Sequence, residues 1–251
     1  MNRTLVIIPA YNEESSLSTV LAELKQETPE LDVVVVSDGS TDRTSDIARE
    51  LGCPVLELPY NVGIGGALRT GFAYAVRHGY ERAVQFDADG QHDPSLLAPL
   101  LARLDDGADL VVGSRFAAGG AVTYEIGKSR RLAMRFLRWL VKVLVGREFT
   151  DTSSGFRAFS RPMLEFFART YPVEYMDSVE ALVLACNAGF RVDEVAANMR
   201  GRTGGAPSTR SIRLAYYYVR LVIVMLTSMT RQRSRDRRAA VHVARREGDP
   251  V

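Results

Sequence analysis

The residues with the clearest chemical potential follow an apolar run at Ala83–Phe86. Asp87 and Asp89 alternate there, and Gly90 and Gln91 come next. If strand alternation continues, the two carboxylates point the same way, and the glycine permits a sharp turn that brings Gln91 beside them. Two like charges so close together are unfavourable unless a cation lies between them. Because all these ligands are oxygens, the segment predicts Mg²⁺ or Mn²⁺, with coordination positions left for phosphate oxygens.

Three other interpretations of this acidic segment stay open. A calcium-binding EF-hand loop would place a glutamate at its twelfth position, where this chain has Ala98. Haloacid-type phosphatases also use an Asp-x-Asp pair, but that pair follows the first strand rather than the fourth. The two aspartates could also simply cap a turn before the next helix. The segment favours Mg²⁺ or Mn²⁺ over these three.

Two polar loops follow the first two expected strands. Pro9–Glu14 stands where a glycine-rich phosphate loop would be, so the fingerprint of nicotinamide enzymes is absent. Ser37–Thr44 contains Asp38, whose carboxylate could accept hydrogen bonds from a base or a ribose. Alone, either loop is typical of a turn with a helix cap. Ligands of open α/β sheets bind outside the carboxyl ends of the strands, where both loops and the acidic segment meet, so together they predict a nucleotide site.

Short apolar runs alternate with helical patterns in the first half of the chain, which predicts an α/β fold with a mostly parallel, Rossmann-like sheet. The expected strands are Leu5–Ile8, Val33–Val36, Val55–Leu58, Ala83–Phe86 and Leu110–Val112. The expected helices between them are Ser15–Gln26, Asp42–Leu51, Gly65–Arg77 and Pro94–Leu104. Further along, we expect helices at Ser129–Val145, Pro162–Arg169 and Asp177–Ala188, and a strand at Arg191–Val195.

The C-terminal part combines an apolar segment with strong positive charge. Residues 200–251 contain 12 arginines, no lysine and 3 acidic residues, a charge of +9 that leaves −7 on residues 1–199. Leu214–Met229 is mostly apolar, but its 16 residues would span only ~24 Å as a helix, short of a ~30 Å hydrocarbon core. We therefore expect 211–230 to be a membrane-interface helix and 231–251 a basic, disordered tail on an anionic membrane surface. Nucleic acid is the less favoured partner, although arginine-rich tails also bind phosphate backbones.

The helix expected at Ser129–Val145 has two stripes along its surface. Its basic stripe is Arg131, Arg135, Arg138 and Lys142, and its apolar stripe is Leu132, Phe136, Trp139, Leu140 and Val143. Such a helix often does no more than cover a sheet. Together with the apolar segment and the arginines after it, it favours attachment at a membrane interface.

Five motifs follow one another in a specific order along the chain. They are Pro9-Ala10-Tyr11-Asn12-Glu13, Asp38–Thr44, Asn61–Gly65, Asp87–Gln91 and Gly113-Ser114-Arg115. In this order they resemble the family 2 glycosyltransferases over about residues 4–210. The resemblance implies a GT-A fold, a GDP- or UDP-linked sugar as donor and inversion of the anomeric centre. It also implies that nucleotide contacts fall on Pro9, Tyr11, Glu13, Asp38 and Asp87, and metal–diphosphate contacts on Asp87, Asp89 and Gln91.

Within that family, the chain is most similar to the dolichyl- or polyprenyl-phosphate sugar synthases. The additional matches are Asp151, Ser154–Arg157, Glu180 and Glu194-Val195. This similarity implies a loop around Arg202 that closes over the donor, and an acceptor-phosphate site at Arg115, Arg130, Arg131 and Ser154. The catalytic residues expected on this basis are Asp89, Arg115 and Arg202. The base and the sugar stay open, because the chain departs from the usual pattern at Ser37, Ile64, Ala196 and Pro207.

A phosphate acceptor agrees with the scarcity of candidate bases. A hydroxyl acceptor needs a general base, whereas a phosphate monoester with a second pKa near ~6 is largely a dianion at neutral pH and can attack unaided. Of the three histidines, only His92 lies near the expected site. We expect His92 to support the acidic segment rather than to act as a base.

The sequence thus predicts an inverting, metal-dependent glycosyltransferase whose GT-A domain is residues 1–210. Its expected reaction moves a sugar from a nucleotide diphosphate to polyprenyl phosphate, at the cytoplasmic face of the cell membrane, as a peripheral protein. One alternative is the same fold acting on a hydroxyl of a soluble or glycan acceptor. Another is a catalytically silent nucleotide-sugar-binding subunit of an integral membrane partner. Cys53 and Cys186 lack disulfide or metal-ligand spacing, which agrees with a reducing cytoplasm.

Overall fold

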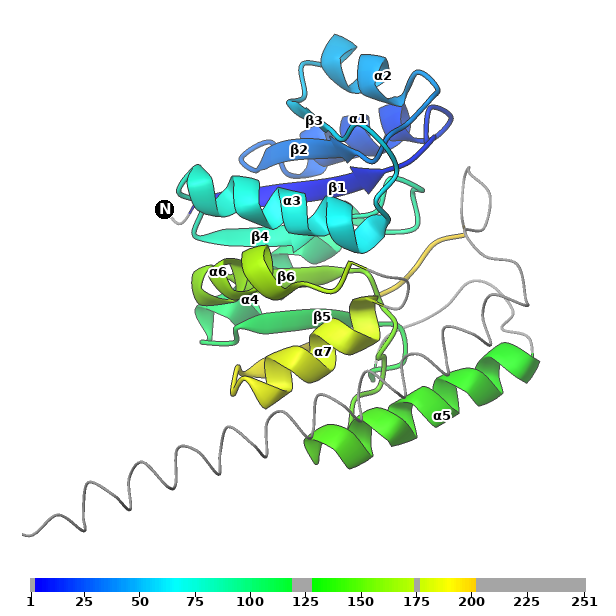
Figure 1. Ribbon diagram of the computed structural model, residues 1–251, viewed down its shortest axis with the longest axis vertical. Helices are drawn as coiled ribbons and strands as arrows, with labels where there is room; N and C mark the ends of the chain where they lie inside the picture. Colours follow the sequence, from blue (N-terminus) through cyan, green and yellow to red (C-terminus); the bar gives the residue numbers. More distant parts are fainter. Residues whose placement is uncertain (1–2, 119–127, 174–176, 202–251) are drawn as a thin grey trace, which may run out of the picture. The chain divides into compact units, whose positions relative to one another are not determined.

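A computed structural model describes residues 3–118, 128–173 and 177–201 of the chain (Figure 1). These residues all belong to one compact unit, Met1–Ala206. The predicted interface helix at 211–230, the basic tail at 231–251 and Arg202 lie outside the described residues, so the predicted boundary at residue 210 stays a prediction.

The described strands form one seven-stranded sheet in the order β3-β2-β1-β4-β6-β5-β7. All neighbouring pairs run parallel except the two that involve β6, which lies antiparallel between β4 and β5. The strands are β1 (Thr4–Ala10), β2 (Asp32–Ser37), β3 (Val55–Glu57), β4 (Arg82–Gln85), β5 (Leu110–Ser114), β6 (Arg157–Ser160) and β7 (Val192–Ala196). The mostly parallel sheet confirms the α/β prediction.

The helices begin and end within about two residues of their predicted positions. They are α1 (Leu17–Glu27), α2 (Thr44–Glu50), α3 (Ile64–Arg77), α4 (Leu97–Asp105), α5 (Lys128–Val145), α6 (Arg161–Thr170) and α7 (Asp177–Asn187). The helix expected to start at Pro94 begins with a short 3₁₀ turn, Pro94–Leu96. Asp93 caps this turn by accepting a hydrogen bond from the backbone N–H of Ser95, as its position before Pro94 predicts.

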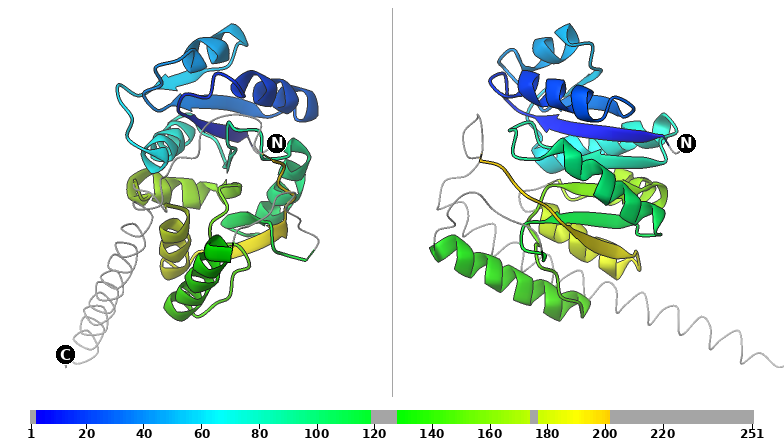
Figure 2. Two further views of the ribbon diagram at one scale, coloured as in Figure 1. Left: turned by 90° about the vertical axis from the view of Figure 1, so that its right-hand side faces the viewer. Right: turned by 180° about the vertical axis from the view of Figure 1, so that it is seen from behind.

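Helices cover both faces of the sheet, which explains why its strands read as continuous apolar runs. On one face, α3 and α6 pack together (Figure 1). The ring of Phe72 packs edge-on against Phe159 and is stacked with Phe167. On the other face, α1 and α4 lie over the sheet in the view from behind (Figure 2). Val6 and Ile8 of β1 belong to the core on that side and are completely buried.

Strand β6 is the one element of the sheet that the sequence pattern does not predict. It has four residues, Arg157–Ser160, and pairs antiparallel with Gln85 at its start and Arg82 at its end. The strand β3 is as short, but β6 has a polar residue at each end, Arg157 and Ser160, so it shows no apolar run. Because β6 runs backwards, its first residue lies at the carboxyl edge of β4, and the loop before it reaches the loops that follow the parallel strands.

Candidate active site

The acidic segment forms the loop after β4, and buried neighbours hold its first carboxylate. The amide nitrogen of Gln85 donates to Oδ1 of Asp87 across 3.3 Å. The backbone N–H of Asp87 donates to Nδ1 of His92 across 3.0 Å, and Nε2 of His92 lies 3.5 Å from Oδ2 of Asp87. The His92 side chain is only 1% exposed, whereas that of Asp87 is 29% exposed. His92 therefore supports Asp87 from within, where we expected it.

Asp89 and Gln91 are ordered by the turn at Gly90, which has a φ of 75°. Asp89 is buried, and its Oδ1 accepts a hydrogen bond from the backbone N–H of Gln91 across 3.0 Å. The side-chain nitrogen of Gln91 donates to the carbonyl of Arg200, whose own N–H donates to the carbonyl of Gln91 across 2.9 Å. The loop is thereby joined to the chain that follows β7.

Gly155, just before β6, lies directly against the acidic loop. A Cβ at this position would come within 2.9 Å of the amide nitrogen of Gln85 and 3.1 Å of Oδ2 of Asp87. Both distances are tighter than ordinary contacts with a Cβ atom, so a larger residue would push the Asp87 carboxylate aside. The absence of a side chain at 155 lets Asp87 occupy its position.

Asp38, expected to contact a base or ribose, binds the backbone of a neighbouring loop. Its Oδ1 accepts from the N–H of Val62 across 2.8 Å, and its Oδ2 accepts from the N–H of Gly63 across 2.9 Å. Burial raises the pKa of Asp38, and these two hydrogen bonds oppose that rise. Gly39 has a φ of 67° and would have its Cβ within 2.5 Å of the backbone at Tyr60. The loops after β2 and β3 are therefore closely packed.

The loop after β1 is bound to the loop after β2. Asn12 adopts a φ of 55°, and its side-chain oxygen accepts from the N–H of Thr41 across 2.8 Å. The N–H of Glu13 donates to the hydroxyl of Thr44, and its carboxylate accepts from Ser16. Pro9 is buried in β1, whereas Tyr11 is 48% exposed. The predicted nucleotide residues thus come from the end of β1 and from the loops after β1, β2 and β4, which are neighbouring strands.

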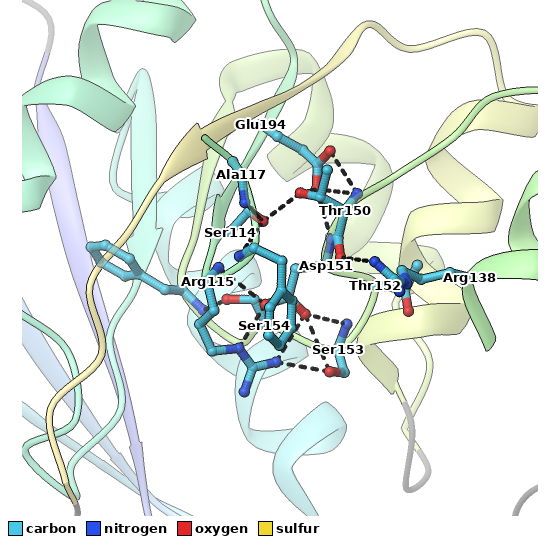
Figure 3. Close-up of polar contacts among 12 residues, drawn as sticks. Ser114, Arg115, Ala117, Arg138, Thr150, Asp151, Thr152, Ser153, Ser154 and Glu194 are labelled. Carbon is cyan, nitrogen blue, oxygen red and sulfur yellow. Dashed lines mark hydrogen bonds and ion pairs between the residues drawn. The ribbon is translucent and has the colours of Figure 1, made fainter. Parts of the chain in front are cut away.

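Arg115, after β5, forms a forked ion pair with Asp151 (Figure 3). Its Nε lies 2.6 Å from Oδ2 and its Nη2 lies 2.8 Å from Oδ1 of Asp151. Nη2 also donates to the hydroxyl of Ser153 across 2.8 Å. Burial raises the pKa of Asp151, but Arg115 and the N–H of Ser153 lower it more, so the pKa lies below its ordinary value. The guanidinium of Arg115 is held in one orientation.

The other residues expected at the acceptor phosphate differ in their exposure to solvent. Ser154 is buried, and its Oγ accepts from the N–H of Phe156 across 3.2 Å. Arg131 lies exposed on α5. Arg130 lies in α5, with its side chain outside the described residues. The loop 150–156 thus connects two predicted sites, because Asp151 holds Arg115 and Gly155 borders Asp87.

A buried polar cluster beneath the acidic loop was missed by sequence reasoning. Arg157 is completely buried, and its Nε donates to the carbonyl of Ser154 across 2.8 Å. The hydroxyl of Tyr171 donates to Asp177 across 2.8 Å. Burial raises the pKa of Asp177, against the opposing effects of the Tyr171 hydroxyl and Arg157. The one sequence signal was a polar Gln85 inside the apolar strand run, which faces Arg157 in the register of β4 and β6.

The donor atoms of the acidic loop suit a metal ion bound together with a diphosphate. Within residues 3–118, 128–173 and 177–201, no group of three or more His, Cys, Asp or Glu side chains could hold a metal. Asp87, Asp89 and Gln91 offer two carboxylates and an amide oxygen. Mg²⁺ accepts one or two carboxylates when substrate phosphates and water complete its coordination. These residues therefore fit a shared protein–substrate site rather than a closed structural one.

The comparisons with known proteins agree with this architecture. Residues 5–167 match the family model described as glycosyl transferase family 2, so the chain belongs to that family. It is 35% identical to the polyprenol monophosphomannose synthase of Mycolicibacterium smegmatis, over 86% of this chain and 85% of that protein. It is also 35% identical to the undecaprenyl-phosphate mannosyltransferase of Micrococcus luteus, over 76% and 75%. A dolichyl-phosphate hexose transferase of Haloferax volcanii is 30% identical, over 79% and 83%.

Solved structures confirm the predicted GT-A fold. Glucosyl-3-phosphoglycerate synthase from Mycobacterium tuberculosis, in complex with Mn²⁺, UDP and glucosyl-3-phosphoglycerate, has a TM-score of 0.66 and 23% identity. The match covers 90% of this chain and 79% of that one. The same enzyme with Mg²⁺ and UDP has a TM-score of 0.66 at 22% identity.

Proposed function

We propose that this protein transfers a sugar, with inversion, from a nucleotide diphosphate to a polyprenyl phosphate, with Mg²⁺ or Mn²⁺ as cofactor. The observation that carries the proposal is the loop 150–156, which contacts the acidic Asp87 at one end and holds the cationic Arg115 at the other. A metal-bound diphosphate and an acceptor phosphate would then lie at neighbouring positions. Three relatives are named for polyprenol monophosphomannose, undecaprenyl phosphate and dolichyl phosphate, and these names support the same acceptor class.

On the donor side, Asp87, Asp89 and Gln91 would hold the metal. When bound, the ion neutralises the charge that develops on the departing nucleoside diphosphate. Pro9, Tyr11, Glu13, Asp38 and Asp87 would form the nucleotide contacts. The base is guanine or uracil in this proposal. Since both oxygens of Asp38 already accept backbone hydrogen bonds, its contribution would include holding the Asn61–Gly63 turn in place for the nucleotide.

On the acceptor side, Arg115, Arg130, Arg131 and Ser154 would bind the phosphate. A guanidinium presents N–H groups in a rigid fork that matches phosphate oxygens. The phosphate dianion attacks the anomeric carbon without a base. The burial of His92 behind Asp87 supports this route, because its ring nitrogens already face the Asp87 backbone and carboxylate. Arg202, outside the described residues, would close over the donor.

A peripheral position at the cytoplasmic face of the membrane would bring the protein to a lipid-linked acceptor. Helix α5 exposes large apolar side chains on the same stripe that the sequence indicates: Leu132 (68%), Phe136 (42%), Trp139 (58%) and Val143 (58%). Basic Arg131, Arg135 and Lys142 are exposed beside them. Apolar and cationic groups side by side are typical of helices that lie in a membrane interface. In the part of the chain that the structure describes, every helix is too short or too polar to cross a bilayer.

We expect the double substitution Phe136→Ser and Trp139→Ser to weaken binding to anionic vesicles by about tenfold or more. Burial of a large apolar side chain in the membrane interface would contribute up to ~1.5–3 kcal/mol to the free energy of binding. Co-sedimentation with phosphatidylglycerol-containing vesicles measures the effect. Leu51→Ser is the matched control, because Leu51 is 48% exposed at the end of α2. Equal loss of binding in the control, or no loss in the double variant, would contradict the assignment of α5 to the membrane.

Gly155→Ala should lower the affinity for Mn²⁺ in the presence of GDP or UDP by about tenfold, since groups that orient metal ligands typically contribute 10–100-fold. The added methyl group would displace the Asp87 carboxylate. Electron paramagnetic resonance titration of free Mn²⁺ measures the affinity. Ala102→Val serves as the control, because it also adds methyl groups, but at an exposed position of α4. An unchanged affinity in Gly155→Ala would show that Asp87 does not bind the ion.

A donor and acceptor screen tests the proposed function. Polyprenyl phosphate, polyprenol and soluble glycans are each offered with radiolabelled GDP- and UDP-sugars, with Mg²⁺ or Mn²⁺ present. We expect labelled lipid with polyprenyl phosphate alone. Labelled glycan would instead indicate a hydroxyl acceptor. Donor binding without any transfer, even with membranes added, would indicate a catalytically silent subunit.

A further inference from the structure

We infer that Glu194 on β7 is a positioning residue for the acceptor phosphate, acting through the Thr150–Asp151 turn on Arg115. The inference rests on the proposed function, because it concerns the phosphate site assigned there to Arg115. The Glu194 carboxylate lies far from the acidic loop in sequence and accepts hydrogen bonds from three donors, two backbone N–H groups and one hydroxyl.

Glu194 clamps two consecutive residues of the loop that precedes β6 (Figure 3). Its Oε1 accepts from the N–H of Thr150 at 3.0 Å, the hydroxyl of Thr150 at 2.9 Å and the N–H of Asp151 at 3.0 Å. Its Oε2 accepts from the N–H of Thr150 at 2.9 Å. Bonds to an ionised acceptor are stronger than neutral ones. Because β7 pairs with β5 in register, with Glu194 opposite Val112, the clamp is tied to the sheet.

The first path from this clamp to Arg115 runs through Asp151. Asp151 is 1% exposed and Arg115 is 7% exposed, so neither side chain can reorient without displacing its neighbours. Asp151 binds Arg115 through both carboxylate oxygens and also accepts from its backbone N–H at 3.3 Å. A shift of the turn that carries Asp151 would therefore move the guanidinium with it.

The second path runs through two hydroxyl groups. The hydroxyl of Thr150 donates to Glu194, so its oxygen can accept a hydrogen bond from the hydroxyl of Ser114, which lies 2.5 Å away. Ser114 then keeps its own lone pairs for the N–H groups of Phe116 and Ala117, at 3.2 Å and 3.1 Å. These hydrogen bonds hold the turn after β5, which contains Arg115. It requires an acceptor at position 194, since each hydroxyl has a single proton to donate.

Glu194→Gln is the informative substitution. An amide nitrogen in place of one oxygen would be a donor facing the Thr150 N–H, which is itself a donor. We expect the Kd for geranyl phosphate, measured by calorimetry, and the KM for polyprenyl phosphate to rise about tenfold, as is typical for loss of a hydrogen bond to a charged group. Donor KM and Mn²⁺ affinity should stay within about twofold, because Gly155, the residue of this loop that borders Asp87, lies beyond the Thr150–Asp151 turn that Glu194 holds.

Three further variants make the test decisive. Asp193→Asn is the matched control on the same strand, because Asp193 pairs with the exposed Arg147 and Arg191 and should leave acceptor binding unchanged. Thr150→Val removes the hydroxyl relay and should reproduce part of the acceptor defect if Glu194→Gln fails to fold. Thr150→Ser keeps the hydroxyl and should restore acceptor affinity to near the wild-type value.

Arg115→Lys separates this inference from the proposed function. If Arg115→Lys weakens geranyl phosphate binding while Glu194→Gln and Thr150→Val do not, the positioning role of Glu194 is wrong and the acceptor site stands. If Arg115→Lys leaves binding unchanged, the acceptor assignment itself is wrong, and the inference falls with it. A defect that is equal for donor and acceptor would also overturn it, since that result indicates a general structural role.

Discussion

Asp89→Ala is expected to reduce transfer on the order of a thousandfold while the protein stays folded, because Asp89 would bind the metal that stabilises the departing diphosphate. Asp89 is 4% exposed, lies in the loop after β4 rather than in a strand, and accepts a hydrogen bond at Oδ1 from the N–H of Gln91 across 3.0 Å. Its loss should therefore disturb the acidic loop more than the sheet. Initial rates at saturating donor and acceptor, with thermal unfolding followed by circular dichroism, measure the two effects separately.

The control for this experiment is Asp106→Ala. Asp106 lies at the exposed end of α4, where it pairs with Arg103 at 3.3 Å. Exposed pairs of this kind contribute ~0–1 kcal/mol, so the control should keep both its activity and its stability. Wild-type turnover in Asp89→Ala would show that the metal is bound elsewhere or is not needed. Loss of the folded state in Asp89→Ala would move the test to Asp89→Asn.

Asp151→Asn should lower the free energy of unfolding at neutral pH by ~3–5 kcal/mol, the usual consequence of breaking a buried ion pair from one side. The substitution leaves the Arg115 guanidinium 7% exposed beside a neutral amide. Urea denaturation followed by circular dichroism measures the change. Asp46→Asn is the control, since Asp46 pairs with Arg49 at 3.5 Å on the surface of α2 and should change stability by less than ~1 kcal/mol.

The same pair predicts how this stability difference depends on pH. The pKa of Asp151 is lowered from 3.8, because the effects of Arg115 and of backbone N–H groups together exceed the raising effect of burial. A carboxylate with a lowered pKa in the folded state stabilises above its unfolded value and loses that contribution as the pH falls through its folded value. The difference in the free energy of unfolding between wild type and Asp151→Asn should therefore be constant from neutral pH to about pH 5 and become smaller below pH 3.8. A stability difference that increased at acidic pH would contradict the ion-pair explanation.

The sequence was sufficient to predict most elements of the fold. Apolar runs predicted five strands because a parallel sheet covered on both faces leaves no polar alternation to disguise them. Apolar residues at helical spacing predicted the helices, because each helix buries only the face that packs on the sheet. Strand β6 was missed because Arg157–Ser160 is polar at both ends and shows no apolar run, and because its place between β4 and β5 depends on long-range pairing.

The candidate site was predictable only where its residues are neighbours in the chain. The acidic loop and the loops after β1 and β2 stand out because several polar residues occur together at the end of an apolar run. Contacts such as Gly155 with Asp87 and Glu194 with Thr150 join segments separated by more than forty residues. A lone glycine or a lone glutamate on a short strand has no local signal of such a role, so the fold itself is needed to reveal it.

The central claim is that a divalent ion lies between Asp87 and Asp89, where it binds the diphosphate of the donor. The most direct measurement is anomalous diffraction from crystals of the full chain soaked with Mn²⁺ and either GDP or UDP. The account predicts an anomalous peak within bonding distance of carboxylate oxygens of both residues and of the diphosphate. A bound nucleotide with no peak at this position, or with the two carboxylates turned away from the ion, would contradict it.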